Sequence, residues 1–279
     1  MKKQDTKKVE VVVVENNSAL PDYLRNGSVV NDDDNFDSSD VSIPMVKLLQ
    51  GLSNECTQFA EAKAGNFWHT GVDMSLGSSF KFVVASRRKK YLLIAPIADG
   101  QGVLARSDDA KTWDRKGSWE VKIDKKNKAT WSIDSLDVAQ SGLTEWGTSN
   151  PDDENSPPAA TLVYEYLVLL PDHMDVGPAV ISLARSAIKK AKKGLNDKIQ
   201  LHRNNGRPLQ SVVFSAKAVE EASDSGAYNN WSFTSAGFAP EAVYRQAMSV
   251  SKLLANYSVK NEEELIEETA TVVDSDSGY

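Results

Sequence analysis

The chain consists largely of short segments rich in β-branched and aromatic residues, and this pattern limits its fold more than any other feature. The most apolar of them, 160–170, ends at Pro171. Residues 119–123 alternate between apolar and charged side chains, 124–128 are polar, and 129–133 return to apolar, which predicts a β-hairpin. Composition and turn signals predict further strands over 79–85, 90–97, 210–219 and 230–238.

Two segments have helical periodicity. Over 180–193, apolar residues recur at helical spacing and Gly194 stands where a helix C-cap is expected. The second segment, 240–257, has Pro240 in its first turn and Val243 and Ala247 on one face. Because strands outnumber helices, the predicted fold class is mainly β with inserted helices (α+β).

Charge is distributed unevenly along the chain. The whole protein has 32 Lys and Arg against 39 Asp and Glu, yet residues 41–259 contain 26 basic and 23 acidic side chains. The two ends carry the excess of acid and too little apolar surface to offset the entropy lost on ordering. We therefore predict a disordered acidic arm over 1–40, one folded domain over 41–258 and a flexible acidic tail over 259–279.

The motifs that usually mark enzymes are absent from the sequence. A single cysteine, Cys56, excludes an intrachain disulfide and a cysteine-rich zinc site. The three histidines are far apart, and the Gly100-Gln101-Gly102 segment lacks the third glycine of a dinucleotide-binding loop. We therefore predict no enzymatic activity, no cofactor and no metal. No apolar run is long enough to span a membrane, and a lone thiol fits a reducing compartment. We therefore expect no membrane partner and a cytoplasmic location, in a cell or in an infected host cell.

Tryptophans and cations are interleaved between residues 111 and 131. Single-stranded nucleic acids are bound in this way, because cations follow the phosphates while aromatic faces stack on unpaired bases. The alternative is that the tryptophans fill a β core, since Trp119 shares a face with Val121 and Ile123. The candidate nucleic-acid-binding residues of this segment are Trp113, Arg115, Lys116, Trp119, Lys122 and Trp131.

Two further clusters of basic residues predict contacts with phosphates. Between 185 and 203, seven Lys and Arg face only one acid, Asp197. A second cluster is a predicted turn at 86–89, between two strands. Either cluster can alternatively be a solvated surface, whereas a phosphate-binding role predicts salt-dependent affinity. The candidates are Lys189, Lys190, Lys192 and Lys193 in the first cluster and Arg87, Arg88, Lys89 and Lys90 in the second.

The C-terminal segment is acidic and ends on an aromatic residue. It closes with Asp274, Asp276 and Tyr279, which we predict as a docking point for partner proteins. A purely solubilising tail is the alternative.

These features together resemble the single-stranded DNA-binding proteins of tailed bacteriophages. The shared features are a β-rich body with an inserted helix, basic and aromatic surfaces, and an acidic tail that ends on an aromatic residue. Segments 43–50 and 65–67 are also similar to the openings of phage proteins of this length. The resemblance implies an OB-like β-barrel, sequence-independent binding of single-stranded DNA in phage replication or recombination, and recruitment of replication or recombination proteins by the tail.

Two other functions stay open at this point. The hypothesis of a β-rich virion structural or assembly protein would explain the strands and the acidic ends, but it assigns no function to the basic segment. A DNA-processing enzyme or nuclease inhibitor would use Asp108, Asp109 and Glu120, the carboxylates near the basic hairpin. The sequence does not distinguish DNA from RNA, and it allows a homo-oligomer.

Overall fold

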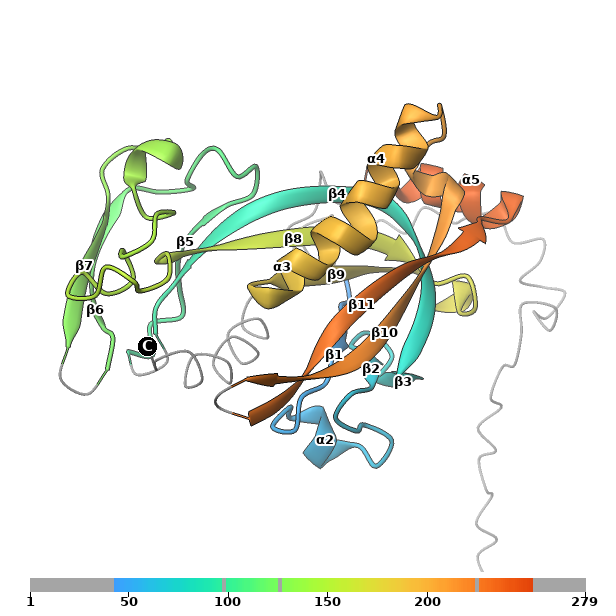
Figure 1. Cartoon of the computed structure of the whole chain (residues 1–279), viewed down its shortest axis with the longest axis horizontal. Coiled ribbons are helices and arrows are strands. Elements are labelled where there is room, and N and C mark those ends of the chain that lie inside the picture. Colours follow the sequence, from blue (N-terminus) through green and yellow to red (C-terminus); the bar gives the residue numbers. More distant parts are fainter. Residues whose placement is uncertain (1–42, 97–98, 125–126, 224–225, 253–279) are drawn as a thin grey trace, which may run out of the picture. The chain divides into compact units, whose positions relative to one another are not determined.

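The computed structural model describes residues 43–96, 99–124, 127–223 and 226–252. They all belong to one unit, Ser38–Tyr279. The predicted arm over 1–40 and tail over 259–279 lie outside the described residues. In chain order (Figure 1) the elements are β1 (Val46–Leu48), α2 (Glu55–Gln58), β2 (Phe67–His69), β3 (Met74–Gly77), β4 (Ser79–Ile94), β5 (Val103–Ser107), β6 (Gly117–Lys122), β7 (Lys128–Ile133), β8 (Ala160–Leu169), β9 (Pro178–Ala184), α3 (Ser186–Ala191), a π-helical segment (Lys192–Asn196), α4 (Asp197–Asn204), β10 (Val212–Ser223), β11 (Gly226–Phe238) and α5 (Glu241–Val250), with short 3-10 turns at Ala139–Ser141, Met174–Val176 and Leu209–Ser211.

The described strands pair as three sheets. The largest has the order β11-β10-β4-β8-β9, with β5 also paired to β4, and the other two are β1-β2-β3 and β6-β7. Strands β10, β4, β8 and β9 lie in the order 4-1-2-3 of a Greek key, because the chain returns through the helix to place β10 beside β4. The predicted class, mainly β with inserted helices, is confirmed.

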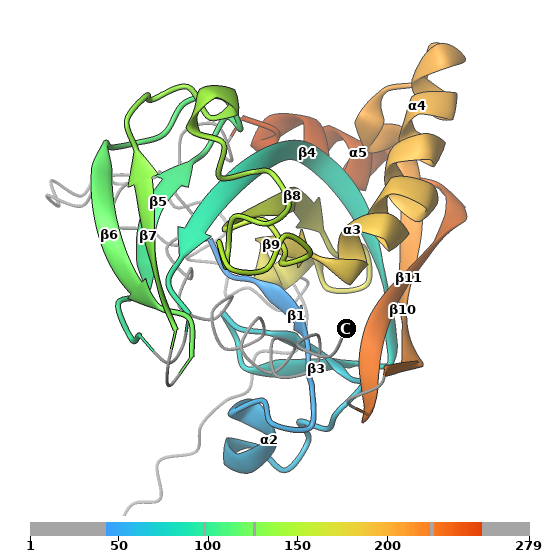
Figure 2. The same ribbon diagram turned by 60° about the vertical axis from the view of Figure 1, so that its left-hand side comes forward.

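The two faces of the large sheet bury different cores. Phe80 and Phe82 of β4 point into a cluster shared with β1–β3 and the helix that follows β9. Val83 and Ala85 point the other way, into a cluster closed by Val243 and other apolar residues of α5. Figure 2 shows the long curve of β4 around this arrangement. A third cluster joins the end of β4 to β5 and the β6–β7 hairpin.

The prediction of two strands separated by a basic turn at 86–89 is wrong. Residues 79–94 form one continuous strand, β4, which pairs with β8 from Val83 to Leu93 through a bulge between Val84 and Ser86. The strand continues through these cations because Arg87, Arg88 and Lys90 have polar partners on neighbouring elements and Lys89 is exposed to solvent.

The prediction of a helix over 180–193 is wrong at both ends. Residues 178–184 form β9, whose pairing with β8 buries Ile181 and Leu183 on one face and Val180 on the other. A strand buried on both faces does not alternate, so its apolar pattern resembled a helix. The helix begins at Ser186 and continues past Gly194 to Asn204.

Gly194 is inside the helix because the helix lies against β11 there. A Cβ at this position would be 2.7 Å from Phe233 Cβ and 2.9 Å from the Phe233 carbonyl oxygen. The glycine is thus required by close packing and does not act as the predicted C-cap. The π-helical turn at the same place is a local widening of the kind that recurs at functional sites.

The remaining elements agree with the sequence prediction in type. The hairpin is confirmed as β6 and β7, with Trp119 opposite Trp131. The strand at 160–170 is β8, and those at 210–219 and 230–238 are parts of β10 and β11. The last helix is α5, which buries Val243 and Ala247 as expected, but it ends at Val250 and the described residues 251–252 form a turn, so the predicted end at 257 is not observed.

A buried histidine makes stability depend on pH. The His69 side chain is fully buried, and its Nδ1 accepts a hydrogen bond from the Gly71 amide at 3.3 Å. Burial lowers the pKa of His69, and nearby His173 acts in the same direction, against a smaller opposing backbone hydrogen bond.

The unfolded chain therefore binds this proton more readily than the folded chain does. We expect the free energy of unfolding to be highest above a pH of about 6.5 and to fall as the pH drops below it. Urea unfolding between pH 7.5 and 5.5 measures this slope, and a His69→Gln variant, which cannot titrate, should show a smaller one. An unchanged slope in that variant would assign the effect to other groups.

Candidate nucleic-acid interface

The middle of β4 presents two cations on the sheet face that also carries Tyr164 and Tyr166. Arg87 lies opposite Tyr166, and Lys89 lies opposite Tyr164 in the pairing with β8. Lys89 is exposed, with its Nζ 5.6 Å from the centre of the Tyr164 ring. Arg87 is half-buried and donates from Nη1 to Asn196 Oδ1 at 2.5 Å. On this face, β4 therefore carries the exposed ammonium group of Lys89 and the guanidinium of Arg87, which is hydrogen-bonded to Asn196.

Asn196 connects this strand to the basic helix. Its Oδ1 also accepts a hydrogen bond from the hydroxyl of Tyr166, and burial raises the pKa of that tyrosine. Burial lowers the pKa of Arg87, Tyr166 opposes this shift, and the charge of Arg203 adds to it. The hydrogen bond between Arg87 and Asn196 places the helix face that carries Asn196 beside β4.

Cations line the exposed side of this helix. Lys189, Lys192 and Lys193 are exposed and precede Asn196 by one to two turns, and Arg203 follows it by about two turns. We call the following set the cationic stripe: Arg87 and Lys89 of β4 with Lys189, Lys192, Lys193 and Arg203 of the helix. Of the eight basic residues predicted in these two segments, four are exposed members of the cationic stripe: Lys89, Lys189, Lys192 and Lys193. Arg87 is its half-buried member.

Two of the predicted phosphate contacts are instead structural. Lys90 is 1% exposed, and its Nζ lies 2.5 Å from Oε1 of the fully buried Glu165. Arg88 Nε lies 2.6 Å from Oε2 of the same carboxylate. We correct the prediction for both residues, because their charges are neutralised inside the sheet.

A third predicted contact, Lys190, is half-buried and paired. Its ammonium group contacts the Glu221 carboxylate, which also accepts hydrogen bonds from Tyr228 and Asn230. These donors lower the pKa of Glu221, with the Lys190 bond as the largest cause. Lys190 thus connects the helix to β10, and its charge is paired there.

The hairpin tryptophans divide between core and surface. Trp113 and Trp131 are buried in the third cluster, at 1% and 3% exposure, so neither offers a face to a base and their predicted stacking role is corrected. Trp119 is half-buried, and its indole packs over the backbone of Gly117. Trp68, another tryptophan near the start of the domain, is fully buried.

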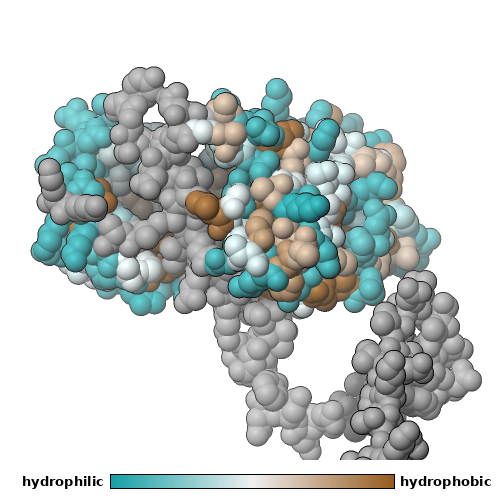
Figure 3. All heavy atoms as spheres, turned by 90° about the horizontal axis from the view of Figure 1, so that it is seen from below, coloured by the Kyte–Doolittle hydropathy of each residue, from teal (hydrophilic) through white to brown (hydrophobic). Residues whose placement is uncertain are grey.

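The basic residues of this region are on the surface. Arg115 is 2.8 Å from Asp114, and the exposed Lys128 pairs across the hairpin with Glu120. Lys116 and Lys122 are exposed and form no ion pair with a described residue. On the face drawn in Figure 3, the end of the body that holds the hairpin is mostly hydrophilic.

A cavity of about 560 Å³ lies beside β4, where one edge of the strand has no strand partner among the described residues. On that edge β4 pairs with β10 only up to Val83 and with β5 only from Tyr91. The lining is mixed in charge: Ser86, Arg87, Arg88, Arg106, Asp108, Asp109, Thr112, Trp113, Asp114 and Ser251.

The acids of this cavity are largely satisfied by their own loop. Asp109 Oδ1 accepts hydrogen bonds from the amides of Lys111 and Thr112 at 2.7 Å each. Desolvation raises the pKa of Asp109, but these bonds outweigh it and lower the pKa overall. Glu120, the third carboxylate considered for an enzyme, is engaged on the hairpin, and no group of described His, Cys, Asp and Glu residues is placed to hold a metal ion.

Sequence reasoning missed two exposed aromatic residues and two polar ones. Trp146 is 71% exposed and Phe238 is 61% exposed. Arg207 lies over the Phe238 ring, 5.0 Å from its centre. The position of Trp146 next to a turn-rich loop, outside any alternating apolar pattern, could have predicted its exposure. No pattern in the sequence predicts the roles of Asn196 and Arg207.

The predicted partner-binding residues Asp274, Asp276 and Tyr279 lie outside the described residues. No described helix is both long and apolar enough to cross a membrane.

The fold and the site define a mainly β protein with a helix inserted into a Greek key and a stripe of exposed cations along that helix. A model of the Pam3 phage gp34-like protein family matches residues 14–260, and the chain belongs to this family. No curated protein and no solved structure matches the chain.

Proposed function

We propose that the protein binds single-stranded nucleic acid, with single-stranded DNA as the expected substrate, and does so independently of base sequence. One observation carries this proposal: Lys189, Lys192 and Lys193 are exposed in a row on one helix, and none forms an ion pair with a described residue. Cations without local counter-charges attract phosphates and release the counterions condensed on them.

The order of the strands in the large sheet is compatible with an OB-fold. An OB-fold is a five-stranded, partly open Greek-key barrel that binds oligonucleotides on its surface. In our proposal β4, β8, β9, β10 and β11 are the five strands of an OB-like barrel, with the basic helix as the connection between the third and fourth. The family name supports a phage origin. In our proposal the protein binds DNA during phage replication or recombination.

Phosphate contacts carry more of this proposal than base stacking does. With Trp113 and Trp131 in the core, Trp119 is the aromatic residue of the hairpin that retains partial exposure. We therefore expect weak discrimination among bases and a strong dependence on salt.

Fluorescence anisotropy with a labelled oligo-dT tests this function directly. The logarithm of the association constant should fall linearly with the logarithm of the salt concentration. A duplex of equal length is the comparison that tests the preference for single strands. An oligo-U of the same length separates DNA from RNA preference. Absence of binding to any single strand at low salt would overturn the proposal.

A further inference from the structure

Two exposed aromatic residues lie on surfaces of opposite charge, and the proposed nucleic-acid contact uses neither of them. They are Trp146 and Phe238, at 71% and 61% exposure. Single exposed apolar side chains are common on proteins, so the surroundings of these two decide their meaning. Trp and Arg are also the residues that most often dominate the energy of protein interfaces.

Trp146 stands on a loop fixed by backbone hydrogen bonds. The Gly147 amide donates to the Ser156 carbonyl at 2.7 Å. This bond brings the backbone of Glu154 next to Gly147, within 3.1 Å of where a Cβ would be. The indole is therefore held outward by a structured loop.

The surroundings of Trp146 are acidic. No Lys or Arg occurs between residues 129 and 184. We call the exposed set Glu145, Trp146, Asp152, Asp153 and Glu154 the Trp146 surface. Its charge would repel a nucleic acid and attract a basic protein surface.

Phe238 has the opposite surroundings. Arg207 lies over its ring, and His202 meets the ring edge-on at 6.1 Å between centres. Arg207 Nη1 and His202 Nδ1 are 3.3 Å apart, and the guanidinium is the donor of this hydrogen bond. Phe238, Arg207 and His202 form what we call the Phe238 surface.

We propose that the Trp146 surface of one copy of this protein binds the Phe238 surface of a second copy. The indole would stack with Phe238 and the Arg207 guanidinium, because Trp is the strongest cation–π partner and a planar guanidinium stacks on aromatic faces. The carboxylates around Trp146 would pair with Arg207. The Trp146 surface thus supplies the negative charge of the contact, and the Phe238 surface supplies the positive charge.

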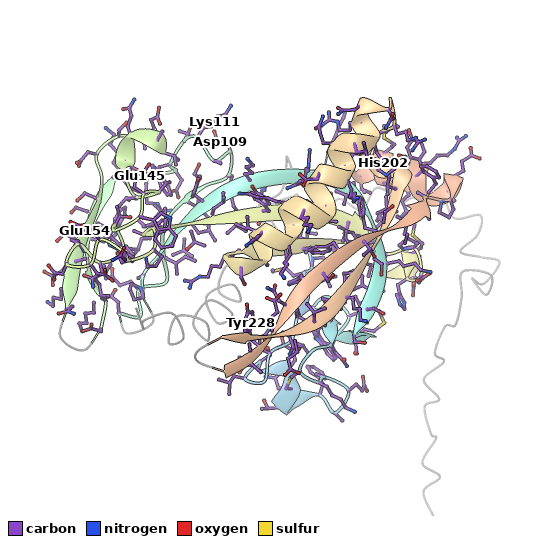
Figure 4. The ribbon with its side chains drawn as sticks, viewed as in Figure 1. Asp109, Lys111, Glu145, Glu154, His202 and Tyr228 are labelled. Carbon is purple, nitrogen blue, oxygen red and sulfur yellow. The ribbon has the colours of Figure 1, made fainter. Side chains whose placement is uncertain are left out.

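The geometry makes this contact heterologous. In Figure 4, Glu145 and Glu154 lie at the end of the body that holds the hairpin, whereas His202 lies on α4, away from it. A copy bound through one surface therefore keeps its other surface free for the next copy. Such contacts propagate head to tail and end in a ring if the rotation between copies closes, or in an open filament if it does not.

Sedimentation velocity without nucleic acid tests the proposal independently of DNA binding. The wild-type protein at low salt should form species larger than dimers as its concentration rises, and salt should reverse this. The Trp146→Ala and Phe238→Ala variants, each alone, should associate at least tenfold more weakly. Mixed in equal amounts they should form a heterodimer and nothing larger, since one good surface remains on each.

The Leu52→Ala variant is the matched control, because it removes an apolar side chain that is 80% exposed elsewhere, and it should associate like the wild type. Far-ultraviolet circular dichroism establishes that each variant is folded. A monomeric wild type, a mixture that fails to associate, or full association by either single variant would overturn the proposal. Binding of a short oligo-dT should be unchanged in Trp146→Ala, so failure here and failure of the proposed function are separate results.

Discussion

Replacing Lys189, Lys192 and Lys193 together with glutamine is expected to weaken binding of single-stranded DNA by about a hundredfold at low salt. These side chains are exposed on one helix, and glutamine keeps their helix propensity while removing the charge. Each phosphate of a single strand that the protein no longer neutralises lowers the salt slope by about 0.7, so the slope should fall by about 2. Anisotropy titrations at several salt concentrations measure both quantities.

A variant of equal net charge separates local contact from general attraction. Lys63, Lys81 and Lys217 are also exposed but lie off the helix, on a loop, β4 and β10. Replacing these three with glutamine should leave the slope near the wild-type value. Equal losses of affinity in the two triple variants would show that the cationic stripe is not the binding surface.

The second large effect concerns the carboxylate buried in the sheet. A Glu165→Gln variant is expected to lose about 3–5 kcal/mol of unfolding free energy, because the buried Lys90 and the partly buried Arg88 lose the charge that compensates them. Urea denaturation monitored by tryptophan fluorescence measures the loss. The contribution should be far larger than that of an exposed pair.

Glu241 provides the comparison. Its ion pair with Arg245 has about three-quarters of each side chain exposed, so Glu241→Gln should cost less than about 0.5 kcal/mol. A variant that replaces both Glu165 and Lys90 with apolar residues should recover part of the loss. If Glu165→Gln were as mild as Glu241→Gln, the buried group would not be a structural ion pair.

The sequence predicted the fold best where an element has one exposed face. The hairpin alternates because one side of β6 and β7 packs on the third cluster, and α5 has a single apolar stripe because it covers one face of the sheet. Prediction failed where both faces are covered. The β9 strand was mistaken for a helix for this reason, since Val180 and Ile181 are both buried, on opposite faces of the sheet.

Composition predicted which segments contribute to the candidate site, but it did not predict which residue pairs with each cation. Arg88, Lys89 and Lys90 are equivalent in the sequence, and only the position of Glu165 on the neighbouring strand distinguishes the buried pair from the exposed lysine. The same holds for Trp113 and Trp119, whose burial depends on the third cluster. Contacts between residues far apart in the chain decide such cases, and no local pattern encodes them.

The pairing of β4 with β8 has a consequence for how quickly the protein folds. Leu93 pairs with Ala160, so residues 94–159 must be gathered into a loop before the centre of the large sheet can form. Closing such a loop costs entropy, and chains dominated by distant pairings fold slowly. The β6–β7 hairpin lies within that loop, and its apolar cluster includes Leu93 and Ala160 at the two ends of the loop. Early folding of this local unit would bring the ends of β4 and β8 together and shorten the search.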